Sequence, residues 1–299
     1  MKSIFIKLFY GLKTDPLGTL LRASIYLFKV VMQIIATLYY YLLRLAISIA
    51  PVFTLAKLKQ KLNPAVQLDY PKRRILLYAD SEISIFRARA CQKEPETVNW
   101  IENQIKPGEV LYDVGANVGA YSLVAASFFD KNITVHAFEP SFSTYYQLAR
   151  NIVLNQFEGC VYPHLMALAD TLGTVVFHYR SLDGGSADHV MDGNTDFDPQ
   201  KAGLPYHQQL ICYGIDDLVS KYDFPVPNHI KVDVDGAENL VLLGASQTLL
   251  NKSIKSILVE VRSTDEQWVR DYLGSKGFEV LSRHDRGGGT IWNYIFVRK

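Results

Sequence analysis

Two carboxylates and a glycine-containing turn are the residues of this chain best suited to bind a small molecule. The run Asp113-Val-Gly-Ala-Asn-Val-Gly119 follows an apolar stretch and precedes a helical one. Gly115 lets the backbone approach a ligand, and a helix beginning near Val118 would direct free N–H groups at it. The dinucleotide fingerprint G-x-G-x-x-G is absent, and Asp113 would repel a pyrophosphate but attract an amino group.

Glu139 is the second carboxylate, in the run Ala137-Phe-Glu-Pro140. It lies about 20 residues beyond the glycine turn, where a carboxylate can accept both hydroxyls of a ribose. Asp113 and Glu139 together therefore predict an uncharged nucleoside that carries an amino acid, which describes S-adenosylmethionine. The alternative for Glu139 is a charge at the N-terminus of the next helix, with Ser141 as the cap.

A third acidic group lies in the run Lys231-Val-Asp-Val-Asp-Gly-Ala-Glu238. We expect Asp233 to contact the acceptor or remove its proton, because an alcohol loses a proton as it attacks a methyl group. Asp235 is interpreted as the cap of the following helix, while Glu238 either reaches back to that cap or contacts the acceptor. Asp233, Glu238 and Glu260 could instead hold a divalent cation. Since spacing alone does not make three ligands converge, we favour a polar pocket without metal.

Repeated strands and helices must position these residues. From Glu109 onward the pattern alternates, which predicts a parallel sheet with helices on both faces and an antiparallel strand pair at the C-terminal end. The predicted strands are 109–114, 133–138, 161–168, 229–234, 256–261, 278–282 and 291–298, and the predicted helices are 118–129, 141–155, 237–250 and 265–276.

One segment of this core, residues 181–209, lacks periodicity and is rich in Gly, Asp, Asn and His. Such an insertion is either a binding loop or a solvated surface loop. Its His189 could contact the acceptor or act as a base, although a solvated loop histidine is the commoner case.

Residues 63–108 precede the core. The β-like runs 74–80 and 83–89, separated by Ser81 and Glu82, predict a hairpin, and a helix is expected over 96–105. Residues 57–68, with three lysines and Pro64, have the composition of a linker.

The net charge conceals two different parts of the chain. Overall, 31 Lys and Arg face 30 Asp and Glu, but residues 1–62 hold nine basic residues against one acid, giving +8. The remaining 22 basic and 29 acidic residues give −7. An acidic body without an evident basic groove argues against a nucleic-acid substrate.

The basic N-terminal arm is also apolar, and a helix is predicted between Pro16 and Pro51. At ~100° per residue, Arg22, Lys29, Gln33, Tyr40 and Arg44 fall on one narrow stripe. The longest uncharged run has 14 residues, 30–43, which is shorter than the ~20 of a typical spanning helix. We therefore favour contact of residues 17–50 with a membrane surface; a spanning helix, or a helix packed on the body or on another chain, are the alternatives.

Three widely spaced cysteines, Cys91, Cys160 and Cys212, indicate neither a disulfide framework nor a thiolate metal site. A reducing compartment fits them. With the basic arm, this predicts a location in the cytoplasm at the cytoplasmic face of a membrane.

The motifs resemble those of the FkbM family of S-adenosylmethionine-dependent methyltransferases over about residues 95–298. The matching segments are 113–119, Phe138-Glu-Pro140, Asn155, Ala167-Leu-Ala-Asp170 and 230–238. The resemblance implies an α/β fold with the class I methyltransferase (Rossmann-like) sheet, in strand order 3-2-1-4-5-7-6, joined here to the apolar helical arm. It also implies that Asp113 and Gly115, within a turn that includes Asn117 and Gly119, hold the methionine part, that Glu139 holds the ribose, and that Asp170 accepts from the adenine amino group or is an ordinary turn residue.

The resulting hypothesis is an S-adenosylmethionine-dependent O-methyltransferase that acts on a hydroxyl of a sugar, glycolipid or related natural product. The arm suggests a lipid-linked or membrane-proximal glycan as acceptor. The alternative is a membrane-attached binding or assembly protein whose methyltransferase fold has lost activity. The domain boundaries expected are 1–62 for the arm, 63–108 for the segment before the core, and 109–299 for the core with its insertion 181–209.

Overall fold

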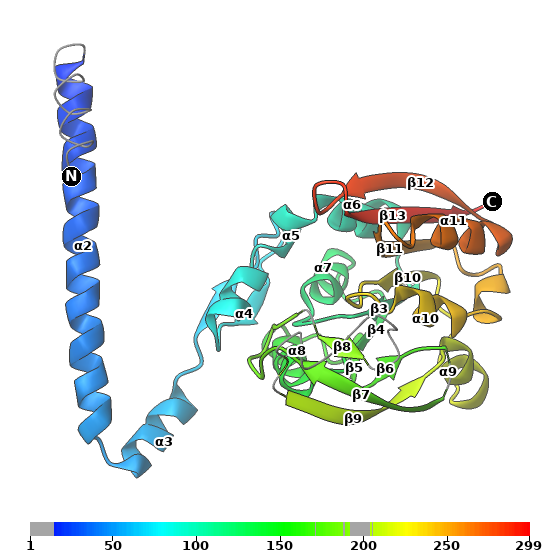
Figure 1. The fold of residues 1–299 in the computed structure, drawn as a ribbon, viewed down its shortest axis with the longest axis horizontal. Helices are drawn as coiled ribbons and strands as arrows, with labels where there is room; N and C mark the ends of the chain where they lie inside the picture. Colours follow the sequence, from blue (N-terminus) through cyan, green and yellow to red (C-terminus); the bar gives the residue numbers. More distant parts are fainter. Residues whose placement is uncertain (1–14, 171, 188, 192–203, 205) are drawn as a thin grey trace. The chain divides into compact units, whose positions relative to one another are not determined.

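The computed structural model describes residues 15–170, 172–187, 189–191, 204 and 206–299. The chain divides into two compact units after Asn63. The described residues of the first unit form the helices α2 and α3, and the second unit contains the sheets (Figure 1).

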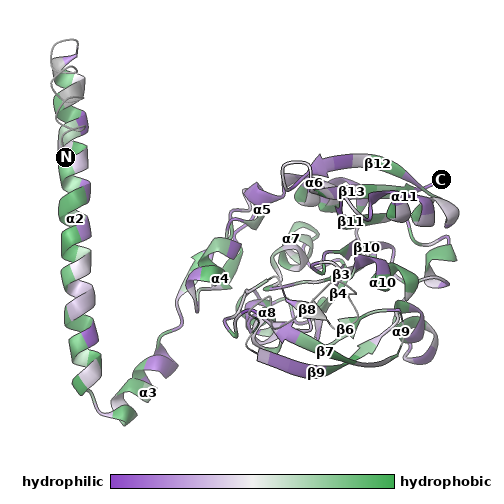
Figure 2. Ribbon diagram, viewed as in Figure 1, coloured by the Kyte–Doolittle hydropathy of each residue, from purple (hydrophilic) through white to green (hydrophobic). Residues whose placement is uncertain are grey.

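The first unit is dominated by the long helix α2, Pro16–Ile49, followed by α3, Val52–Lys61. The Asp15 side chain caps α2 by accepting from the Gly18 N–H at 3.0 Å, and the helix ends before Pro51. The predicted helix is confirmed, whereas the linker predicted from residue 57 is wrong because α3 continues to Lys61. Apolar residues follow α2 along its length (Figure 2), and the large ones are exposed.

The second unit is built on a seven-stranded sheet in the order β12-β13-β11-β10-β3-β4-β5. All neighbouring pairs from β11 to β5 are parallel, and β13 runs antiparallel to both β11 and β12. Counted along the chain, this is the predicted order 3-2-1-4-5-7-6, so the fold class is confirmed. The strands are β3 Val110–Val114, β4 Thr134–Phe138, β5 Val161–His164, β10 His229–Val232, β11 Ser256–Arg262, β12 Phe278–Asp285 and β13 Ile291–Arg298.

The strand register brings the predicted site residues to one edge. Asp113 of β3 is paired with Lys231 of β10 and with Ala137 of β4. The residues that follow β4 and β10, Glu139 and Asp233, therefore lie beside Asp113 at the carboxyl ends of the parallel strands. This edge is where open α/β sheets bind their ligands.

Helices cover both faces of this sheet with separate apolar cores. One core joins α6, Pro95–Gln104, with α7, Ala120–Phe128, and α8, Phe142–Leu154, and includes buried Ile101, Val124 and Leu148. The other includes buried Leu218, Val241 and Val269 from three further helices. Those helices are α9 Ile215–Lys221, α10 Glu238–Leu243 and α11 Glu266–Ser275, with a 3₁₀ turn at Thr248–Leu250. The predicted helix 237–250 is thus two short segments.

A second sheet, to which the described residues contribute four strands in the order β6-β9-β7-β8, was not predicted. The strand expected over 161–168 is interrupted at Leu165 and Met166, because β5 joins the main sheet while β6 pairs with β9. The described part of the insertion is not wholly irregular, since it contributes β8 and the start of β9. The strands are β6 Ala167–Leu168, β7 Gly173–Tyr179, β8 Val190–Met191 and β9 Tyr206–Tyr213.

The segment before the core corrects the predicted hairpin. β1, Ala65–Gln67, pairs antiparallel with β2, Leu76–Tyr78, and residues 82–87 form helix α4 (Glu82–Arg87), followed by α5, Ala90–Lys93. Ser81 caps α4 by accepting from the Ser84 N–H, while the Ser84 hydroxyl accepts from the Ser81 N–H. This capping box favours the helix over a second strand.

Candidate active site

The turn after β3 depends on its glycines for packing. Gly115 has φ of 79° and Gly119 has φ of 88°, in the left-handed region that favours glycine. A Cβ on Gly115 would lie 1.8 Å from the carbonyl oxygen of Asp233, and one on Gly119 would lie 2.5 Å from Cδ1 of Leu148. The glycines therefore let the turn approach the end of β10 and helix α8. Helix α7 begins at Ala120, two residues later than predicted.

Asp113 lies near the carboxyl end of β3, and one of its two carboxylate oxygens has no hydrogen-bond donor among the described residues. It is 1% exposed, and its Oδ2 accepts a 2.6 Å hydrogen bond from the Ser122 hydroxyl. Its Oδ1 is buried without a hydrogen-bond partner, although the Lys231 Nζ lies 3.6 Å away. Since a buried acceptor without a donor is costly, this oxygen fits a ligand that supplies an amino group.

Glu139 joins the end of β4 to the turn after β3. Its Oε2 accepts from the Asn117 N–H at 2.9 Å and its Oε1 accepts from the Ser141 N–H at 2.8 Å. Each oxygen keeps a second lone pair for a ligand hydroxyl. Burial raises the pKa of Glu139 to about 7, against the lowering effect of the two N–H groups. Ser141 also caps α8, so the carboxylate that was predicted to bind ribose additionally orders the helix N-terminus.

Asp233 lies directly beyond β10, and its side chain is 27% exposed. Its Oδ2 is 3.1 Å from Nζ of Lys231, which is itself only 2% exposed. Burial alone raises the pKa of Asp233, but the Lys231 ammonium outweighs it and holds that pKa below its ordinary value, with Lys93 and Arg87 adding to the lowering. Asp233 is therefore an ionised acceptor at neutral pH.

The predicted cap at Asp235 is wrong. Asp235 has φ of 55°, its carbonyl accepts from Arg262 at 2.8 Å, and α10 begins at Glu238 after Ala237 with no side-chain cap. Glu238 does reach back, because its Oε1 accepts from the Val234 N–H at 3.2 Å and the Gly236 N–H at 3.0 Å. This loop is thus closed by Glu238 from inside, and Asp235 has no capping role.

Glu238 and Glu260 both prefer the protonated form more than free glutamates do. Burial raises the pKa of Glu238 to about 6. Burial, and after it the charges of Asp233 and Glu238, raise the pKa of Glu260 to about 8. Among the described residues, no three His, Cys, Asp or Glu side chains are grouped so that they could hold a metal ion. The divalent-cation alternative for Asp233, Glu238 and Glu260 finds no support.

The start of the insertion packs over the glycine turn. Asn117 donates from Nδ2 to the Ser186 carbonyl at 3.0 Å, and Arg87 of α4 donates from Nε to the Gly185 carbonyl at 2.8 Å. His189 is buried against the rings of Phe177 and Tyr179, at centroid distances of 5.5 and 5.2 Å. The interpretation of His189 as a solvated loop histidine is therefore wrong.

Asp170, in contrast, is exposed just beyond β6. It lies on the turn to which the resemblance assigns the adenine, so its role stays a prediction.

Three charged residues of this edge were missed by sequence reasoning. Lys231 belongs to the motif 231–238 but has no role predicted from the sequence, and Arg87 lies in a predicted strand. Glu94 is 5% exposed at the start of α6 and pairs with Arg286 at 2.6 Å. One signal in the sequence could have indicated a buried Lys231. This residue lies between apolar Ile230 and Val232, in a strand that is predicted to be covered on both faces.

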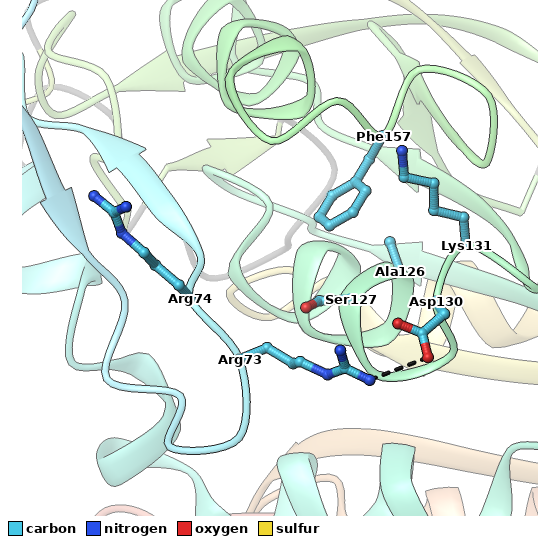
Figure 3. Close-up of a pocket in the computed structure, with 7 residues that line it drawn as sticks. All are labelled: Arg73, Arg74, Ala126, Ser127, Asp130, Lys131 and Phe157. Atoms are coloured by element: carbon cyan, nitrogen blue, oxygen red, sulfur yellow. Dashed lines mark hydrogen bonds and ion pairs between the residues drawn. The ribbon is translucent and has the colours of Figure 1, made fainter.

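A surface pocket of about 300 Å³ lies elsewhere (Figure 3), and its lining includes Lys131, three residues before β4, and Phe157, four residues before β5. Arg73 there pairs with Asp130 at 3.0 Å. The complete lining is Arg73, Arg74, Ala126, Ser127, Asp130, Lys131 and Phe157. None of the predicted site residues lines it, so it is separate from the carboxyl edge.

Comparison with known proteins gives a consistent set of relatives. A sequence model of the "Methyltransferase FkbM domain" matches residues 113–280. The chain is 26% identical over 179 residues to the hexuronic acid methyltransferase AglP of Haloferax volcanii, covering 60% of this chain and 66% of that protein. It is 26% identical over 204 residues to the 31-O-demethyl-FK506 methyltransferase FkbM of Streptomyces tacrolimicus, covering 61% and 77%.

Among solved structures, precorrin-6y C5,15-methyltransferase from Geobacter metallireducens is 12% identical, with a TM-score of 0.41 over 69% of this chain and 86% of that one. The aligned part of AglP is just under two thirds of that protein's length.

Proposed function

Because a methyltransferase FkbM domain covers residues 113–280, the chain belongs to the FkbM family of methyltransferases, and on that premise we propose that it is an S-adenosylmethionine-dependent O-methyltransferase acting on a sugar hydroxyl. The observation that carries the proposal is the meeting of Asp113, Glu139 and Asp233 at the carboxyl edge of the sheet. Each provides a carboxylate suited to a different part of the reaction.

Asp113 and Glu139 are the residues that hold the cofactor. The unpartnered Oδ1 of Asp113 receives the amino group, and the remaining lone pairs of Glu139 receive the ribose hydroxyls. The turn 115–119 brings main-chain atoms close to the ligand. Asn117 and Gly119 determine the path of the main chain through this turn. When bound, S-adenosylmethionine supplies an electrophilic methyl group on a positively charged sulfur.

Asp233 is the residue that takes the acceptor's proton. Its side chain is partly exposed at the edge and stays ionised beside Lys231. A carboxylate oxygen of Asp233 would accept the proton of the acceptor hydroxyl as that hydroxyl is methylated. Glu238, whose pKa of about 6 lies close to neutrality, orders the adjoining loop and is a second group for acceptor contact.

We further propose that the acceptor sugar carries a carboxylate. Arg87 and Lys93 lie close enough to Asp233 for their positive charges to lower its pKa, and Lys93 is largely exposed. An acidic sugar would pair with these cations while offering a neighbouring hydroxyl to Asp233. The relative AglP is named a hexuronic acid methyltransferase, which supports this acceptor class.

The arm is proposed to place the enzyme at the cytoplasmic face of a membrane. The segment Leu20–Ile49 of α2 is long and apolar enough to cross a membrane, which is weak support by itself. Its exposed apolar residues and its basic Arg22, Lys29 and Arg44 suit contact with apolar chains and anionic headgroups. A lipid-linked acidic glycan is then the proposed acceptor, and failure of alkaline carbonate to extract the protein would indicate spanning instead of interfacial contact.

Titration calorimetry of the full-length protein in detergent tests the cofactor assignment. The wild type should bind S-adenosylmethionine, and Glu139→Ala should abolish measurable binding, while Asp233→Asn serves as a control that retains it. No binding by a folded wild type would contradict the proposed function.

A further inference from the structure

Lys231 is a buried cation at the centre of the proposed site. It lies on β10 between core residues Ile230 and Val232, and it is 2% exposed. Its Nζ is 3.1 Å from Oδ2 of Asp233, 3.6 Å from Oδ1 of Asp113 and 5.4 Å from the centroid of the Tyr121 ring. One ammonium therefore contacts the carboxylate on the acceptor side and faces the carboxylate on the cofactor side.

The charges packed around Lys231 come from several elements. Burial alone lowers its pKa, but Asp233, Asp113 and then Glu94 raise it above the ordinary value of a lysine, so it remains an ammonium. Glu94 is itself paired with Arg286 and Lys93, at 2.6 and 3.5 Å.

Asp233 has further neighbours of both signs. Lys93 and Arg87 lower its pKa, while Glu238 and Glu260 carry raised pKa values that Asp233 helps to produce. Lys231 is the cation that contacts Asp233 most closely among the described residues.

We propose that Lys231 is a positioning residue whose ammonium takes the place of a divalent cation and keeps Asp113 and Asp233 ionised together. This role of Lys231 rests on the proposed function, in which the cofactor's amino group and the acceptor's hydroxyl each donate a hydrogen bond to an ionised carboxylate. Asp113 is buried, Asp233 is 27% exposed, and both carboxylates face the Lys231 ammonium. Without that cation the two like charges would repel each other in a poorly solvated place, so one of the carboxylates would bind a proton.

The first test needs no ligand and compares Lys231→Met with Lys231→Arg, which keeps the charge. Thermal unfolding of the full-length protein is measured from pH 5.5 to 8. In folded Lys231→Met, the carboxyl pair Asp113 and Asp233 binds a proton at low pH, which stabilises the folded state. This proton is lost as the pH rises. The deficit in Tm relative to wild type should therefore grow with pH in Lys231→Met and stay constant in Lys231→Arg. An equal deficit at every pH in Lys231→Met, including failure to fold throughout, would overturn the proposal.

The second test measures protons during cofactor binding. Calorimetric titrations of S-adenosylmethionine at pH 7 in phosphate and in Tris give the number of protons released. Lys231→Met should release close to one proton more than wild type, because the incoming amino group displaces the proton from the carboxyl pair. Lys255→Met, which removes an ammonium from Glu109 at the amino end of β10 and β3, should match wild type.

Equal proton release in Lys231→Met and wild type would contradict the role of Lys231. If the wild type does not bind the cofactor, the proposed function fails, whereas the unfolding test still decides the role of Lys231.

Discussion

The main-chain N–H of Asn117 donates a 2.9 Å hydrogen bond to Oε2 of Glu139. The turn after β3 and the end of β4 are thereby joined through the carboxylate that is proposed to hold the ribose. A change at Glu139 consequently acts on the ligand contact and on the shape of the glycine turn together.

Glu139→Gln should weaken binding of S-adenosylmethionine about 10- to 100-fold, because it removes charge-assisted hydrogen bonds worth ~1.5–3 kcal/mol. Calorimetry at pH 8 measures this change. Glu158→Gln, a substitution of an exposed glutamate elsewhere on the surface, is the matched control and should bind like wild type. Equal affinity in Glu139→Gln and wild type would remove Glu139 from the cofactor site.

The pH dependence of cofactor binding should follow Glu139. Burial raises its pKa to about 7, so in the free protein the carboxyl group gains a proton as the pH falls below neutrality and loses its strength as an acceptor. The dissociation constant should therefore rise as the pH falls from 8 to 6. In Glu139→Gln this rise of the dissociation constant at low pH should be absent. If the pH dependence of binding is the same in Glu139→Gln and wild type, the titrating group is not Glu139.

Asp233→Asn should retain cofactor affinity within about threefold but lower methyl transfer by about 10²–10⁴, the usual range for loss of a general base. The amide keeps the shape of the side chain and an oxygen that can accept from Lys231, but it cannot take the acceptor's proton. Single-turnover transfer from labelled cofactor is the measurement. Full activity in Asp233→Asn would exclude Asp233 as the base.

Gly115→Ala should destabilise the fold by about 2–4 kcal/mol, because the residue has φ of 79° and the new Cβ would meet the Asp233 carbonyl oxygen. Gly159→Ala is the control, since nothing lies within 4 Å of its Cβ position. Urea unfolding of the two variants should differ by that amount. Similar stability would show that the turn and the end of β10 are not packed as described.

Reversal of the basic stripe in Arg22→Glu, Lys29→Glu and Arg44→Glu should reduce flotation of the full-length protein with vesicles that contain anionic lipid. The reason is loss of attraction worth ~1 kcal/mol for each basic residue near the surface. Vesicles of neutral phosphatidylcholine are the control, on which wild type and variant should differ little. Flotation of neither protein on either vesicle would contradict membrane contact by the arm.

The sheet and the positions of Asp113, Glu139 and Asp233 were predictable because their signals are local. Each carboxylate ends an apolar strand, and strands that alternate with helices place such ends on one edge. The order of the seven strands followed from the family resemblance and is confirmed by the strand pairing.

The errors arose where specific side-chain contacts, most of them with distant segments, decide the local structure. Residues 83–87 carry β-favouring side chains, yet the Ser81–Ser84 capping box and packing of Arg87 on Gly185 make them helical. Asp235 has no capping role because α10 begins only at Glu238, and its carbonyl instead accepts from Arg262, 27 residues away in β11. The burial of Lys231 depends on Asp113 from another strand, which no local pattern around residue 231 indicates.

Transfer of a labelled methyl group from S-adenosylmethionine to a cell-envelope extract tests the central claim most directly. The proposed function predicts label in an acidic sugar, as a methyl ether that resists mild alkali, with transfer strongly reduced in Asp233→Asn. Label that mild alkali releases would indicate a methyl ester and contradict a hydroxyl acceptor. No transfer by a wild-type protein that binds the cofactor, in extracts rich in uronic-acid glycans, would contradict the proposed enzyme.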